Sequence, residues 1–89
     1  MEFLHQYKNS VADSEGRMYV CKAFGEQRED GLWQAWLVFF PQDGRQALPT
    51  ERESTQSNRE FASYWAAGLE QVYLEGALER ALRISASSG

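Results

Sequence analysis

The stretch GLWQAWLVFFP, residues 31–41, decides the fold that this sequence predicts. In a β-strand, alternate side chains point to opposite faces of the sheet. Gln34 is the only polar side chain in the run, so neither face of this strand is polar. A strand with one wet face alternates apolar with polar residues, so this strand needs cover on both sides. One side carries Leu32, Gln34, Trp36, Val38 and Phe40, and the other carries Trp33, Ala35, Leu37 and Phe39.

Two more strands are expected before this stretch. Residues 3–7 suggest a short first strand, with Phe3, His5 and Tyr7 alternating with Leu4 and Gln6. RMYVCKAF, residues 17–24, predicts a second strand. Residues 25–31, GEQREDG, predict a charged hairpin loop because Asp-Gly is a strong turn signal. The second strand would place Met18, Val20, Lys22 and Phe24 on one face and Tyr19, Cys21 and Ala23 on the other.

After the turn at residues 41–44, a weaker fourth strand is expected within residues 45–54. Pro49 has no N–H to donate to a ladder, so this strand is expected at an edge or in broken form. Ser57 and Glu60 then form a capping-box pattern, which predicts the start of a helix.

Two apolar stripes follow, and they lie on nearly opposite sides of a continuous helix. We therefore predict a break at Gly68, with positive φ at the position after the helix end. The expected helices are about residues 58–67 and 70–83, and a single kinked helix is the alternative. The first stripe is Phe61, Trp65, Leu69 and Val72, and the second is Leu74, Leu78 and Ala81.

This order predicts an α+β fold with a three- to four-stranded antiparallel sheet and a C-terminal helix or helix pair, β-β-β-(β)-α-α. We expect one domain over residues 1–84 and a flexible tail over residues 85–89. The first helix is expected to cover one face of the central strand. The other face is expected to be covered by the second helix or, more easily, by a second chain.

Composition narrows the function. The formal net charge of −4 and the scattered basic residues argue against nucleic acid or an anionic membrane as the main partner. Cys21 is the only cysteine, which excludes an internal disulfide and a cysteine zinc cluster. With no signal-like start and no long apolar run, the cytoplasm is the expected location.

The middle of the chain resembles the N-terminal domain of HicB-type antitoxins. The resemblance covers about residues 18–69 and lies in layout, with Asp30-Gly31, Phe40-Pro41, Gly44 and the Ser57–Glu60 cap at the corresponding places. It implies a domain that binds a partner and forms oligomers rather than a catalyst.

The residue types that carry catalysis form no convincing constellation. His5 is the only histidine, and Cys21 lies in an apolar strand where a thiol behaves as a small hydrophobe. Glu51 and Glu53 share a strand face and could form an acid–base pair, but a solvated edge is the favoured interpretation. We therefore expect no enzyme activity, no metal and no cofactor.

The tryptophans are the strongest candidates for a binding role. Trp33 and Trp36 point to opposite faces of one strand, and at least one of them belongs to the core. The other could pack under the second helix, lie in a homodimer interface, or stack on a ligand or a single-stranded nucleic acid, helped by Arg28 or Arg45. We expect a homodimer, with interface candidates Trp33, Trp36, Leu74 and Leu78.

Overall fold

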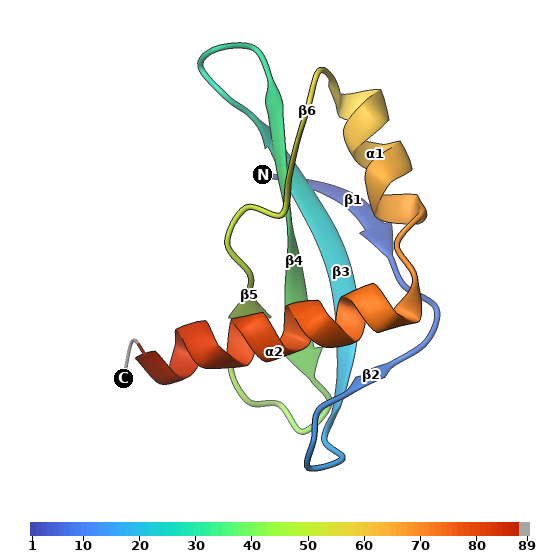
Figure 1. Ribbon diagram of the computed structural model, residues 1–89, viewed down its shortest axis with the longest axis vertical. Helices are drawn as coiled ribbons and strands as arrows, with labels where there is room; N and C mark the ends of the chain where they lie inside the picture. Colours follow the sequence, from blue (N-terminus) through green and yellow to red (C-terminus); the bar gives the residue numbers. More distant parts are fainter. Residues whose placement is uncertain (88–89) are drawn as a thin grey trace.

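The computed structural model describes residues 1–87. Within them, six strands form one antiparallel sheet, and two helices follow at the C-terminal end (Figure 1). This confirms the predicted α+β class and element order. The elements are β1 (Glu2–Gln6), β2 (Val11–Ala12), β3 (Met18–Gln27), β4 (Trp33–Pro41), β5 (Leu48–Pro49), β6 (Ser54–Gln56), α1 (Arg59–Ala67) and α2 (Gln71–Ser87).

The sheet is four strands wide, although more strands than four contribute to it. β3 and β4 form the long centre and pair continuously from Tyr19–Pro41 to Gln27–Trp33. β1 and β2 lie one after the other along the free edge of β3, and β5 and β6 do the same along β4. The expected width of three to four strands is therefore correct, but both outer columns are divided.

The N-terminal strand departs from simple alternation. The register shifts between Phe3 and His5, so Phe3 pairs with Phe24 while His5 pairs with Ala23. The prediction that Phe3, His5 and Tyr7 share one face is therefore wrong. Leu4 lies against Gly25, where a Cβ would meet the Leu4 side chain at 2.9 Å. Gly25 is thus inside β3 rather than in the predicted loop, and the hairpin turn narrows to residues 28–32.

The outer edge beside β4 is broken after Pro49, as its missing N–H predicts. Between β5 and β6, Thr50 replaces ladder bonds: its N–H donates to Leu37 O at 2.8 Å, and its Oγ1 accepts from Leu37 N at 3.1 Å. The N–H of Glu53 donates to Ala35 O at 2.8 Å. The buried β4 backbone therefore stays hydrogen-bonded while residues 50–53 leave the strand.

The predicted helix break is present, but its local geometry differs. Asn58, not Ser57, caps α1, because its Oδ1 accepts from Phe61 N at 2.9 Å. Gly68 ends α1 with φ −89° and ψ −2°, so the predicted positive φ is wrong. α2 continues through residues 85–87, which the sequence assigned to a flexible tail, and residues 88–89 lie outside the described residues.

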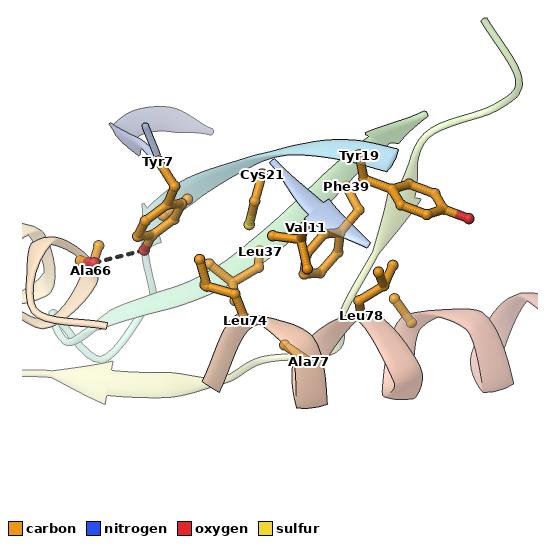
Figure 2. Close-up of a cluster of buried hydrophobic side chains, with 12 residues drawn as sticks. Tyr7, Val11, Tyr19, Cys21, Leu37, Phe39, Ala66, Leu74, Ala77 and Leu78 are labelled. Carbon is orange, nitrogen blue, oxygen red and sulfur yellow. Dashed lines mark hydrogen bonds between the residues drawn. The ribbon is translucent and has the colours of Figure 1, made fainter. Parts of the chain in front are cut away.

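Both helices pack on one face of the sheet. Figure 2 shows Cys21 and Leu37 on the sheet side facing Leu74 and Leu78 of α2, while Tyr7 points toward α1. The break frees α2 to turn its own stripe to the same core, so the expectation that this stripe faces a second chain is wrong. The remaining core members are Val11, Tyr19, Ala23, Phe39, Ala66, Ala77 and Ala81.

α1 approaches the sheet through small residues. Ala62 and Ala66 are fully buried, whereas Phe61 is 49% exposed and Val72, on α2, is 71% exposed. The predicted stripe from Phe61 to Val72 is therefore wrong at both ends. Tyr7 fastens the last turn of α1, because its hydroxyl donates to Ala66 O at 2.6 Å (Figure 2). No helix in residues 1–87 is long and apolar enough to cross a membrane.

Candidate functional site

The two faces of the β3–β4 ladder have different surroundings. Odd-numbered residues such as Cys21, Ala23 and Leu37 point into the core under α1 and α2. Even-numbered residues point to the other side, which neither helix covers. We call this side the open face. Its side chains on the long strands are Met18, Val20, Lys22, Phe24 and Glu26 of β3 and Gln34, Trp36, Val38 and Phe40 of β4.

An aromatic row crosses the middle of the open face. Phe24 pairs with Trp36 on one side and with Phe3 of β1 on the other. The Phe3 and Phe24 rings meet edge to face with centroids 6.1 Å apart. Phe3 is 52% exposed, and Phe24 and Trp36 are half-buried. Three large aromatic side chains thus lie in one line across three strands, accessible from outside.

The charges on the open face stand on either side of this row. Lys22 is two residues before Phe24 on the same face of β3, and its Nζ lies 5.0 Å from the centre of the Phe40 ring. Glu26 is two residues after Phe24 on the same face, and it makes an exposed contact of 3.7 Å with the N-terminal amine. The Gln34 amide donates to Glu26 at 3.4 Å. The face is therefore apolar at its centre, with one cation and one carboxylate flanking that centre on β3.

The structure separates the four predicted interface residues. Trp36 lies on the open face, while Trp33 is half-buried on the side that the helices cover. Leu74 and Leu78 are only 2% and 1% exposed in the core beneath α2. Their own sheet covers them, which removes them from any surface open to a second chain.

Sequence reasoning did not assign Phe3, Phe24 or Phe40 to a binding surface. The even-numbered alternation of the second strand was already visible and included Phe24. The pairing register between β3 and β4 places Phe24 beside Trp36, and the bulge in β1 places Phe3 beside Phe24. Neither the register nor the bulge has a signal in a single sequence.

Glu51 and Glu53 line the same groove but differ in their surroundings. The Glu53 carboxylate, 9% exposed, accepts from Tyr73 Oη at 2.6 Å and from the Arg80 guanidinium. Burial, followed by the hydrogen bond to Glu53, raises the pKa of Tyr73 to about 12. Glu51 is exposed beside a groove of about 450 Å³ between residues 51–53 and the end of α2. Glu53 therefore ties two elements together.

His5 and Cys21 also lie in structural surroundings. Cys21 is fully buried, and burial raises the pKa of its thiol to about 12, which keeps it protonated and unreactive near neutral pH. The His5 ring packs edge-on against Tyr7 with centroids 4.7 Å apart. Within residues 1–87, no three His, Cys, Asp or Glu side chains gather in a way that could hold a metal ion.

Comparison with known proteins adds no relative. No family model matches the chain, and neither a curated protein nor a solved structure matches it. The open face is therefore the feature from which we infer a function.

Proposed function

We propose that this chain is a small, non-catalytic protein-interaction module whose binding surface is the open face. The observation that carries the proposal is the aromatic row of Phe3, Phe24 and Trp36 on a side of the sheet that neither helix covers. Large apolar patches on monomeric proteins mark interaction sites, and aromatic side chains are enriched at interface centres.

Two further expectations belong to this proposal. The resemblance to HicB-type antitoxins implies partner binding, which is the same class of function. A cytoplasmic location fits a chain whose cysteine is unpaired and buried, since small extracellular domains are commonly held by disulfides.

Binding of a single-stranded nucleic acid or a flat ligand is the second candidate. The aromatic row favours it, because bases stack on exposed aromatic rings. The charge disfavours it, because Lys22 shares the face with Glu26 and the chain carries a net charge of −4. The ultraviolet absorbance ratio of the purified protein separates the candidates, and we expect the ratio of pure protein.

Site-specific photocrosslinking tests the main proposal. A photoreactive phenylalanine analogue replaces Trp36 in the full chain, and the matched control carries it at Val72, which is 71% exposed on α2. We expect protein adducts of discrete mass from position 36 and none of the same mass from position 72. Adducts to nucleic acid alone, or equal labelling from both positions, would contradict the proposal.

A further inference from the structure

We infer that the occupant of the open face is a second copy of this chain, docked face to face about a two-fold axis at the Phe24–Trp36 pair. The inference rests on the proposed function, because it names the partner for the same surface. In this arrangement Lys22 of each chain lies opposite the partner's Glu26, on either side of an aromatic centre.

The order of residues along the ladder meets the requirement of a two-fold interface. In such an interface, residue i contacts residue j and residue j contacts residue i. Lys22 and Glu26 are each two residues from Phe24, and they point to the same side. An axis that lies between the sheets and perpendicular to the strands sets β3 across β3 in the opposite direction. It therefore places the Lys22–Val38 pair over the partner's Glu26–Gln34 pair.

This axis lies one pair from the middle of the β3–β4 ladder, which runs from Tyr19–Pro41 to Gln27–Trp33. On one side of the Phe24–Trp36 pair come Lys22–Val38 and then Val20–Phe40. On the other side come Glu26–Gln34 and then the hairpin turn, where Arg28 N donates to Leu32 O at 2.7 Å. A two-fold axis at the Phe24–Trp36 pair therefore overlaps most of the face and sets the Val20–Phe40 end against the partner's hairpin turn. It also brings the largest aromatic side chains to the centre, where interface energy concentrates.

Charge complementarity selects this register. No ion pair to Lys22 occurs among residues 1–87, and its ammonium lies over an aromatic ring. The side chain of Glu26 is 50% exposed, beside the N-terminal amine that it contacts at 3.7 Å. Stacked sheets lie about 10 Å apart, which the extended lysine and glutamate side chains together can bridge. Each dimer gains two such pairs, whereas placing Lys22 over Lys22 would bring like charges together.

The area is sufficient for a modest dimer. Eight residues of strand span about 27 Å, and four strands span about 15 Å, so each chain offers about 400 Å² before side-chain relief is counted. Two copies then bury about 800 Å² of accessible surface before side-chain relief is counted, which is the range of weak, transient interfaces below about 1,200 Å². Two sheets packed face to face with aligned strands are common in β-sandwiches.

Charge exchange between two variants tests the inference. Sedimentation equilibrium of the wild type at about 100 µM, a concentration suited to an interface of this size, should give twice the chain mass of 10.2 kDa. Lys22→Glu and Glu26→Lys each create two like-charge contacts in their homodimers and should sediment as monomers. Mixed in equal amounts, they restore two opposite-charge contacts and should form a heterodimer. The Glu79→Lys variant, which makes the same charge change at an exposed position of α2, should stay dimeric.

Each outcome has a defined meaning. A monomeric wild type overturns the inference, whereas protein adducts from position 36 would still support the proposed function. A dimeric wild type whose two variants stay monomeric on mixing overturns the Lys22–Glu26 register. Circular dichroism checks folding, and the neutral variants Lys22→Gln and Glu26→Gln should each weaken the wild-type dimer severalfold. Unchanged dimerisation in both neutral variants also counts against the register.

Discussion

At the scale of single residues, Gly68 ends α1 without leaving the right-handed region. Its φ of −89° is open to any L-residue. A Cβ added there would lie 3.4 Å from Tyr64 O and 3.8 Å from Trp65 O, which are ordinary contacts. The break therefore does not depend on glycine. Leu69, the residue after the break, packs against the core.

Gly68→Ala should raise the free energy of unfolding by up to about 1 kcal/mol, because alanine restricts the unfolded chain and favours helix. The urea midpoint measures the change. Gly31→Ala is the matched control, since Gly31 has φ +87° in the hairpin turn, and it should destabilise the fold. A lower midpoint for Gly68→Ala would show that the helix end needs glycine after all.

At the scale of elements, Glu53 connects the broken edge strand to α2. It lies between β5 and β6 and accepts hydrogen bonds from Tyr73 and Arg80 of α2. The Arg80 guanidinium also lies 5.6 Å from the centre of the Tyr73 ring. This polar cluster holds residues 50–53 against the helix where the sheet ladder is interrupted.

Glu53→Gln should lower the free energy of unfolding by about 1–2 kcal/mol, because hydrogen bonds to a charged, mostly buried group stabilise the fold more than hydrogen bonds between neutral groups. The value stays at the low end because the Arg80 side chain is 42% exposed and gains water when freed. Glu51→Gln, on the same segment but exposed, should change stability by less than about 0.5 kcal/mol. Equal losses in both variants would remove the special role of Glu53.

At the scale of the whole molecule, the helices and the sheet form two layers with one buried interface. Two weakly acidic side chains, Tyr7 and Cys21, lie in that interface, and burial keeps them protonated. Burial raises the pKa of Tyr7 well above its usual value, and it raises the pKa of Cys21 from 9.0 to about 12. Above pH 9 the unfolded chain releases the Cys21 proton that the folded chain retains, so rising pH favours unfolding.

Stability should therefore be level with respect to Cys21 below pH 9 and should fall between pH 9 and about 12. The slope contributed by one such group reaches about 1.4 kcal/mol per pH unit. Thermal unfolding of the wild type and of Cys21→Ala, followed from pH 8 to 10, separates the thiol from the tyrosines, because tyrosine in the unfolded chain ionises around pH 10. Parallel curves for the two proteins would contradict the assignment.

The sequence by itself determined the faces of the central strands, because a side-chain period of two is local backbone geometry. It also determined the turns at Asp30-Gly31 and at residues 41–44, the weak edge at Pro49, and the existence of a helix break. Each of these follows from residues adjacent in the chain, so one sequence contains the signal. The apolar character of both faces of residues 31–41 belongs to the same class.

Only the tertiary structure decided which face the helices cover. Both helices share one core because small residues, Ala62 and Ala66 on α1 and Ala77 and Ala81 on α2, let them approach the sheet closely. The bulge after Phe3 and the register between β3 and β4 then place Phe3, Phe24 and Trp36 in one row on the other side. Such long-range pairings are decided by competition among alternative packed arrangements. The periodicity of the local sequence does not show which arrangement wins.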